Sequence, residues 1–319
     1  MKTRLTQFGV CLMVGILLGA GSAWAQGPSK VRFGLPVEAL DGLAIYVAQD
    51  RGFFAEQGLT AELTILRGGA GVIQTLISGD VDIGMVGPVE ISVMRSKGVD
   101  VRVIGTSLDM PVMSVLANKQ LNITSMAGLK GRSIGVTAPA SLTDAMARHF
   151  VLKAGLQPGK DVTILSLGGG PEMIGAFKTR KVDALIIFEP FIQVLLAEGN
   201  ANLILDVPKE LVGFPSFGVV VSKRLIDTNP NLPRKTMAAL VKALKFIRTD
   251  PTTTRAIAQK KFPKIKPEVL NPALDHYLPH FSKDGVISPA AMQFSQELLK
   301  SAGLIQTVLP YSEIYVQMK

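Results

Sequence analysis

Six short segments rich in glycine, proline and small polar residues each separate an apolar run from a segment with helical periodicity. They are Leu35-Pro36, Arg67-Gly68-Gly69, Gly87-Pro88, Ala138-Pro139-Ala140-Ser141, Gly168-Gly169-Gly170 and Glu189-Pro190. A helix that begins in such a segment carries unpaired backbone N–H groups and a positive dipole end in its first turn. Glycine lets a ligand approach this backbone closely, so together the segments predict an anion site. For any single segment, a simple strand-to-helix turn explains the composition equally well.

Four side chains in or beside these segments are candidates for binding. Ser141 and Thr143 lie where an N-cap belongs; capping alone explains both, whereas the functional interpretation has the Ser141 hydroxyl holding an oxyanion. Arg67 is the only cation in the six segments and could pair with a carboxylate or sulfonate, although such arginines more often extend into solvent. Glu189 precedes a proline and could accept hydrogen bonds from amides of its own loop instead of contacting a ligand.

Known catalytic and metal-binding motifs fit the sequence poorly. Residues 213–218 have the wrong spacing for a nucleophile elbow, and residues 69–74 lack the third glycine of the dinucleotide fingerprint. His276 and His280 are spaced as zinc ligands on a helix, but Pro279 lies between them and no third ligand is evident. The sequence therefore predicts binding without turnover, and neither a metal nor a cofactor.

The first 25 residues have the pattern of a secretory leader. A basic start is followed by an apolar run over residues 8–20 and by Ala23-Trp24-Ala25. A retained membrane anchor is the alternative, although the run is short for one. The only cysteine and the only tryptophan of the chain, Cys11 and Trp24, both lie in this segment. We therefore predict a periplasmic protein that begins at Gln26 and contains neither a disulfide nor a cysteine nucleophile.

Basic residues outnumber acidic ones by nine, and many of them fall between positions 234 and 266. Nucleic acid is a possible partner for such a cluster. However, Met237, Leu240, Leu244 and Ile247 form one apolar helical stripe, which places the charges on the opposite, solvated face. No aromatic residues alternate with these charges, as they would in a surface that stacks bases. We predict no nucleic-acid partner.

Two stretches about a hundred residues apart, 31–99 and 132–200, share one pattern. The matching pairs are Gly34 with Gly135, Gly58 with Gly155, Gly68 with Gly168, Asp82 with Asp183, Pro88 with Pro190 and Gly98 with Gly199. Each stretch alternates strand and helix, which predicts two α/β lobes. Continuous apolar runs such as residues 184–188 indicate strands buried on both faces of a parallel sheet.

The predicted elements follow from this repeat. Strands are expected near residues 31–35, 60–66, 81–86, 101–107, 132–137, 162–167, 182–188 and 203–207, and helices near 40–57, 71–78, 88–97, 141–154, 171–179 and 190–197. Strands 113–117 and 219–222 follow two crossings between the lobes, and later helices begin near Pro233, Pro251, Pro267 and Pro289. We expect a signal peptide at 1–25, a first lobe at 30–110 plus 215–319 with the C-terminal helices, and a second lobe at 111–214. Each lobe is a mostly parallel sheet flanked by helices, and the cleft between them closes by rotation at two hinge crossings.

Four ordered motifs resemble a known family. They are Gly-Phe-Phe-Ala-Glu-Gln-Gly-Leu (52–59), Ser-Gly-Asp-Val-Asp-Ile-Gly (78–84), Leu-Lys-Gly-Arg-Ser-Ile-Gly-Val (129–136) and Phe-Glu-Pro-Phe (188–191). Over residues 31–220 the chain resembles periplasmic solute-binding proteins of ABC importers, of the nitrate/taurine/alkanesulfonate type. The resemblance implies a two-lobed, type II-like periplasmic binding protein. Such a protein works as a monomer that delivers a solute to a membrane permease and its ATPase.

The resemblance also implies positions for the ligand groups. They fall at Leu35, Pro36, Gly87, Pro88, Ser141, Thr143 and Glu189, and we add Arg67, Gly69 and the crossing residues Phe214 and Ser216 as candidates. Members of the family commonly carry Trp where this chain has Phe188, and the first loop lacks their polar or aromatic side chain. Both differences make the cleft more apolar. We therefore expect a small organic anion, a carboxylate or sulfonate that is aromatic or aliphatic, in place of nitrate.

Several alternatives remain open at this point. A binder of a thiamine-pyrimidine precursor is the alternative within the same class. A periplasmic hydrolase or a relative of a pyrimidine synthase would be an enzyme instead, and a binding protein coupled to a sensor would have a receptor as its partner.

Overall fold

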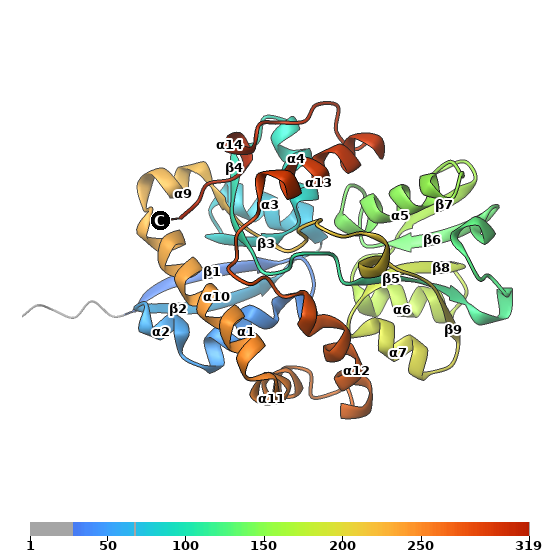
Figure 1. Cartoon of the computed structure of the whole chain (residues 1–319), viewed down its shortest axis with the longest axis horizontal. Coiled ribbons are helices and arrows are strands. Elements are labelled where there is room, and N and C mark those ends of the chain that lie inside the picture. Colours follow the sequence, from blue (N-terminus) through green and yellow to red (C-terminus); the bar gives the residue numbers. More distant parts are fainter. Residues whose placement is uncertain (1–27, 67, 319) are drawn as a thin grey trace, which may run out of the picture.

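The computed structural model describes residues 28–66 and 68–318. The predicted leader and Arg67 lie outside these residues, so neither prediction has a structural counterpart here. Within the described part, no helix combines the length and the apolar character that a bilayer crossing requires. The described chain forms two lobes that lie side by side along the long axis of the molecule (Figure 1).

The first lobe is built on a five-stranded sheet in the order β2-β1-β3-β10-β4. Its strands are β1 (Ser29–Leu35), β2 (Leu59–Ile65), β3 (Ile83–Val86), β4 (Val101–Thr106) and β10 (Gly218–Ser222). β1 pairs in parallel with β2 and β3, whereas β10 runs antiparallel between β3 and β4. A strand from far along the chain therefore completes a sheet whose other strands come from the first 106 residues.

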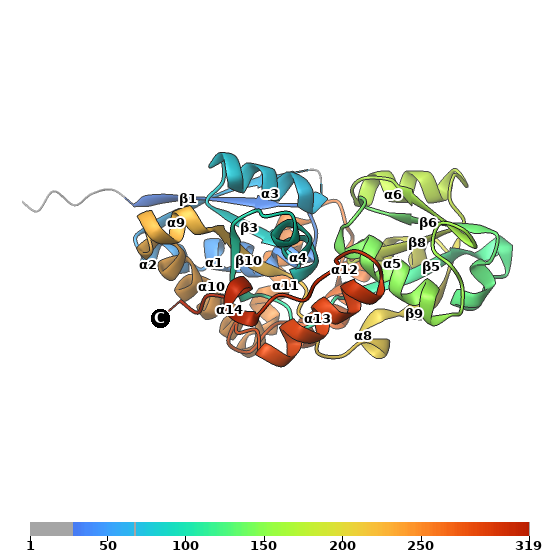
Figure 2. The same ribbon diagram turned by 90° about the horizontal axis from the view of Figure 1, so that it is seen from above.

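Helices cover both faces of this sheet (Figures 1 and 2). One face carries α1 (Leu43–Asp50), α2 (Phe53–Glu56), α10 (Asn231–Thr249) and α11 (Pro251–Lys261), which share a core with Phe33 and Val219. The other face carries α3 (Gly68–Ser78), α4 (Pro88–Ser96) and α14 (Tyr311–Ile314), around Val103 and Val220. α9 (Lys223–Thr228) follows β10 directly. The inner strands β3 and β10 are buried on both faces, which explains their continuous apolar runs.

The second lobe repeats the design in the order β7-β6-β8-β5-β9. Its strands are β5 (Met113–Asn118), β6 (Arg132–Val136), β7 (Val162–Ser166), β8 (Ala184–Phe188) and β9 (Ala201–Asp206). β5 is antiparallel to both β8 and β9. One face is covered by α5 (Leu142–Lys153) and the other by α6 (Gly170–Lys178) and α7 (Phe191–Ala197), while α8 (Val207–Glu210) follows β9. The predicted α/β architecture of two mostly parallel sheets is confirmed.

The repeated Asp ties β1 to the loop before β3 in the first lobe and β6 to the loop before β8 in the second lobe. Asp82 Oδ2 accepts a hydrogen bond from the Arg32 backbone N–H at 2.9 Å, and Asp183 Oδ2 accepts one from the Ser133 N–H at 2.8 Å. The repeated glycine on β6 serves packing, because a Cβ atom on Gly135 would lie 2.4 Å from a methyl of Leu167. The repeat therefore preserves the contacts that hold β1 and β6 in place.

One predicted helix is wrong as a single element. Residues 40–57 form a 3₁₀ turn (Leu40–Gly42) followed by α1 and by the short α2. The helical segment is interrupted at Gly52, the N-cap residue of α2. Its φ of 71° lies in the left-handed region. Glycine adopts this conformation without the steric cost that other residues pay, so the break is encoded at that position. The apolar periodicity continues across the break, which is why the sequence pattern alone does not show it.

The two crossings, residues 107–112 and 211–217, run alongside each other. Ser216 donates from its backbone N–H to the Leu108 carbonyl at 3.1 Å and from Oγ to the Met110 carbonyl at 2.8 Å. Ser107 N–H in turn donates to the Phe217 carbonyl at 2.9 Å. Two lobes joined by such a paired connection have the geometry of a hinge.

The C-terminal helices extend beyond the first lobe. α12 (Pro267–Tyr277) contacts α7, and α13 (Pro289–Ser301) contacts α5, so both reach the second lobe (Figure 2). Leu298, Leu299 and Ile305 share one apolar cluster with Met146 and Phe150 of α5. α11, α12 and α13 begin at the predicted prolines, and α10 begins two residues before Pro233. Part of the contact between the lobes therefore depends on helices that follow the second crossing.

Candidate functional site: a cavity between the lobes

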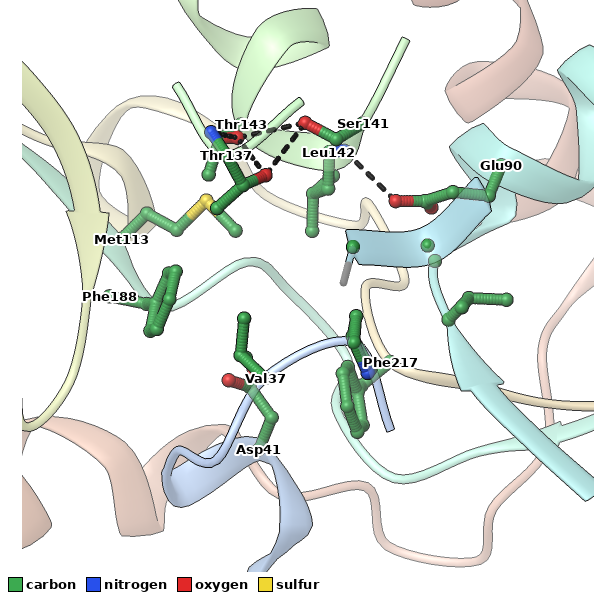
Figure 3. A pocket seen from close by; sticks show the side chains of 15 residues that line it. Val37, Asp41, Glu90, Met113, Thr137, Ser141, Leu142, Thr143, Phe188 and Phe217 are labelled. Carbon is green, nitrogen blue, oxygen red and sulfur yellow. Dashed lines mark hydrogen bonds between the residues drawn. The ribbon is translucent and has the colours of Figure 1, made fainter. Parts of the chain in front are cut away.

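A cavity of about 450 Å³, including its mouth, lies where the C-terminal ends of the strands of both sheets meet. The first lobe contributes Pro36, Val37, Asp41, Gly68, Gly69, Val86, Gly87, Glu90 and Phe217 to its wall, and the second lobe contributes Met113, Thr137, Ser141, Leu142, Thr143 and Phe188. Ligands of open parallel sheets bind at this edge. Figure 3 shows that the two lobes face each other across the cavity.

Three hydroxyl groups of the second lobe form a ring at one side of the cavity. Thr137 Oγ1 donates to Ser141 Oγ at 3.0 Å, Ser141 Oγ lies 2.9 Å from Thr143 Oγ1, and Thr143 Oγ1 lies 2.8 Å from Thr137 Oγ1. Ser141 also caps α5, because its Oγ accepts the Asp144 N–H at 3.3 Å. Thr143 Oγ1 accepts the Thr137 N–H at 2.9 Å. Thr143 therefore does not serve as the cap; it joins α5 to the end of β6.

Two carboxyl groups stand on the first lobe's side (Figure 3). Glu90 on α4 is almost fully buried, and its Oε1 accepts the Leu142 N–H of the second lobe at 3.1 Å. Asp41, in the turn before α1, accepts a hydrogen bond from the Tyr277 hydroxyl. Burial raises the pKa of Glu90 to about 7, against smaller opposing effects of backbone hydrogen bonds. Burial likewise raises the pKa of Asp41 to about 6, although the Tyr277 hydrogen bond opposes the change.

The remaining wall is apolar. Phe188, Met113, Val37, Leu142 and Phe217 surround the space between the hydroxyl ring and the carboxyl groups (Figure 3). A cavity with an apolar wall and a few converging polar groups is the usual form of a small-molecule site. Phe188, which replaces the tryptophan common in the resembled family, is therefore a wall residue.

The predicted glycines of the first lobe lie at the cavity for a reason that the sequence does not reveal. A Cβ atom on Gly69 would lie 2.4 Å from Cγ of Glu90, and one on Gly87 would lie 2.8 Å from the Ser216 carbonyl. Both glycines therefore make room for parts of the protein itself. Gly169 and Gly170 lie instead along a wider groove that shares Pro36 and Val37 with the cavity.

The structure brings some predicted site residues into the cavity wall and leaves others outside it. Pro36, Gly69, Gly87, Ser141 and Thr143 line the cavity. Leu35, Pro88, Glu189, Phe214 and Ser216 do not line it: each is buried in a core, in a helix start or in the crossings. Phe214 packs edge-on against Phe294 with ring centres 6.4 Å apart. Arg67 precedes the wall residue Gly68, but it lies outside the described residues.

Glu189 belongs to a contact between the lobes. Its carboxylate accepts hydrogen bonds from the Gln193 side chain at 3.0 Å and from His276 Nδ1 at 2.9 Å. The other ring nitrogen of His276, on α12, lies 3.1 Å from Asp206 Oδ1 at the end of β9. Burial lowers the pKa of His276, but the hydrogen bond and charge of Glu189 together with Asp206 outweigh this, so the net shift is upward. Within the described residues, His276 and His280 are not part of any cluster suited to a metal.

Sequence reasoning missed Asp41, Glu90 and Thr137, and it considered His276 only as a zinc ligand and not as a contact between the lobes. Glu90 had a signal, since an acidic residue in the first turn of a helix that begins at a strand end faces that edge of the sheet. His276 had none, because its partners lie 70 and 87 residues away along the chain.

Comparison with known proteins supports this picture. The model of the family described as NMT1/THI5 like matches residues 41–254, about two thirds of the chain. The chain belongs to this family. One relative is a 4-amino-5-hydroxymethyl-2-methylpyrimidine phosphate synthase, THI5, of Saccharomyces cerevisiae. The two are 26% identical over 244 residues, which cover 72% of this chain and 68% of the synthase.

Solved structures show the same fold. The alkanesulfonate-binding protein SsuA of Xanthomonas axonopodis, bound to MOPS, has a TM-score of 0.78 at 20% identity, with 91% of this chain and 99% of SsuA covered. The periplasmic nitrate-binding protein NrtA of Synechocystis PCC 6803 has a TM-score of 0.70 at 15% identity, with 89% of this chain and 83% of NrtA covered. The predicted resemblance to periplasmic solute-binding proteins, and with it the type II-like fold, is confirmed.

Proposed function

We propose that the protein is the periplasmic solute-binding component of an ABC importer and captures a small organic molecule between its lobes. The observation that carries the proposal is the cavity itself, whose wall is shared by two lobes that are joined through paired crossings. Rotation about such crossings opens the cavity to solvent and closes it over a ligand. The permease and its ATPase would then receive the closed form.

The small organic anion expected from the sequence is one candidate ligand. The α5 N-terminus and the Ser141 hydroxyl favour it. Glu90 and Asp41 oppose it, because each repels an anion when ionised and each faces the same cavity. None of the described wall residues is a cation. An anion would therefore have to bind while at least one carboxyl group holds its proton.

An amino-substituted pyrimidine is the second candidate. The family match and the yeast synthase support it, since the name of that enzyme contains such a pyrimidine. A flat ring fits an apolar wall that includes Phe188 and Phe217, and ring substituents would meet the carboxyl and hydroxyl groups. Because that relative is a synthase, turnover of the ligand is the alternative to simple binding. Recovery of the bound ligand chemically unchanged would argue against turnover.

The test is a thermal-shift screen of sulfonates, aromatic carboxylates and aminopyrimidines, followed by small-angle scattering of the hits. A ligand of the cavity raises the melting temperature with the logarithm of its concentration and makes the protein more compact. The variant Val37→Trp, which fills the cavity, should abolish both effects. Ile77→Trp, at a position near the end of α3 that is 52% exposed, serves as the control. Hits that bind Val37→Trp unchanged, or that leave the scattering curve unchanged, contradict the proposal.

A further inference from the structure

One oxygen atom in the cavity wall lacks a partner. Four buried side-chain polar atoms of the described residues have no hydrogen-bond partner, and Glu90 Oε2 is the one that belongs to a residue of this cavity. Glu90 is only 7% exposed, so water satisfies the group poorly. Leaving such an atom unpaired costs free energy, and native proteins rarely accept that cost without a function.

The other oxygen of the same carboxyl group is held by the opposite lobe. Glu90 Oε1 accepts the N–H of Leu142, the first residue of α5. This bond and the close contact with Gly69 fix the carboxyl group, which Figure 3 shows directed from α4 toward the cavity. The orientation of Oε2 in this arrangement of the lobes is therefore set by the protein itself, which reduces the entropic cost of holding a ligand there.

Protonation of Glu90 does not satisfy Oε2, because the added hydrogen would itself need an acceptor. A donor from the ligand satisfies it directly. Asp41 stands in the same wall with its own carboxyl group, so the first lobe offers two acceptors and, among its described wall residues, no positive charge. A ligand whose nitrogen carries protons matches this wall better than a carboxylate, a sulfonate or nitrate does.

We propose that Glu90 is the specificity-determining residue of the cavity and that the solute presents an N–H group to its Oε2, as an amine, amidine or amino-substituted heterocycle would. This inference rests on the proposed function of solute capture in this cavity. Because Oε1 binds the second lobe while Oε2 binds the solute, one carboxyl group connects ligand recognition to lobe closure. A ligand that carries only acceptors at this position would leave the group unpaired.

Benzamidine and benzoate test the inference, because they have the same size and ring but carry a donor cation and an acceptor anion. Their affinities for wild type, Glu90→Gln and Glu268→Gln are measured by titration calorimetry. Glu268 is exposed on α12, so Glu268→Gln removes the same charge away from the cavity. We expect wild type and Glu268→Gln to bind benzamidine at least about tenfold more tightly than benzoate. Glu90→Gln should lose about tenfold to a hundredfold for benzamidine, the loss that a charged hydrogen bond predicts.

Three results would overturn the inference. The first is that wild type binds benzoate more tightly than benzamidine and that Arg67→Ala loses the benzoate binding. The second is an unchanged benzamidine affinity in Glu90→Gln, and the third is that wild type does not bind benzamidine. Circular dichroism and the melting temperature establish that Glu90→Gln is folded. The proposed function is tested separately. It remains supported after any of these results if the wider screen finds another solute that makes the protein more compact and whose binding Val37→Trp abolishes.

Discussion

Glu90 shows how a single buried carboxyl group constrains what the cavity can hold. Burial raises its pKa to about 7, and backbone hydrogen bonds oppose this shift only in part. The folded protein therefore keeps a proton that the unfolded chain loses near pH 4.5, so the group makes folding less favourable as the pH rises.

This gives a prediction for the ligand-free protein. Between about pH 4.5 and pH 7, the free energy of unfolding of wild type should fall relative to that of Glu90→Gln, by up to about 3 kcal/mol at 1.4 kcal/mol per pKa unit. Above pH 7 the difference should level off. Urea unfolding across this range measures it, with Glu268→Gln as the control that keeps the wild-type slope. Parallel curves for wild type and Glu90→Gln would show that the carboxyl group is ionised at low pH in the folded state.

Little of this could be predicted from residue types alone. Ser141 was identifiable, because a serine between the end of a strand and the start of a helix is usually the N-cap of that helix. The role of Glu90 depends on Leu142, 52 residues further along the chain, and on the space that Gly69 provides. Such a convergence is a property of the closed fold, and no local pattern encodes it.

At the scale of elements, the repeat was the most informative signal. The duplicated Asp82 and Asp183 tie β1 and β6 in place, so the spacing that revealed the lobes also reports a contact that stabilises them. The prolines marked helix starts well, because proline fits the first turn of a helix. The break at Gly52 was missed, since apolar periodicity continues through a turn whose only sign is one glycine.

Helix α5 offers a matched experiment on capping and binding. Ser141 caps α5 at the cavity, and Ser288 caps α13 with its Oγ 3.1 Å from the Ala291 N–H. Each change to alanine should lower the free energy of unfolding by about 1 kcal/mol, the usual cost of a lost N-cap. Only Ser141→Ala should also weaken ligand binding, by about tenfold or more, because its hydroxyl belongs to the cavity wall.

Chemical unfolding and calorimetry on the same two variants separate these effects. Equal affinities in Ser141→Ala and Ser288→Ala would mean that the Ser141 hydroxyl only caps the helix. The three hydroxyl groups would then serve only to connect the end of β6 to α5, without a role in binding.

For the whole molecule, the arrangement of the lobes depends on polar contacts as well as on the apolar cluster around α5 and α13. His276 can donate from both ring nitrogens to Glu189 and Asp206 only when it is protonated. The other groups near it are His280, with ring centres 6.4 Å apart, and Lys209, which lies 3.2 Å from Asp206. The net balance raises the pKa of His276, so its contribution is complete below the ordinary value of 6.5 and is lost as the pH rises through the higher, folded value.

We therefore expect the closed form to weaken above about pH 6.5. Scattering and unfolding of wild type from pH 5 to pH 9 should show expansion and a loss of about 1 kcal/mol, since the group is partly exposed. His276→Gln should remove this pH dependence, whereas His280→Gln, which lacks the two carboxylate contacts, should keep it. An unchanged pH profile in His276→Gln would assign the effect to other groups.

The position of β10 between β3 and β4 also determines the order in which the first sheet can be assembled. The strands of the second lobe are consecutive in the chain, from Met113 to Asp206, so that lobe has all its strands once they are synthesised. The first sheet has a gap between β3 and β4 until Ser222 has been made, although its other strands are complete by Thr106. A growing chain therefore carries a first sheet that cannot be completed before β10 has been made, and non-local pairing of this kind is slow. If the chain crosses a membrane unfolded, as the predicted leader implies, this topology delays completion of the first sheet until β10 has been released.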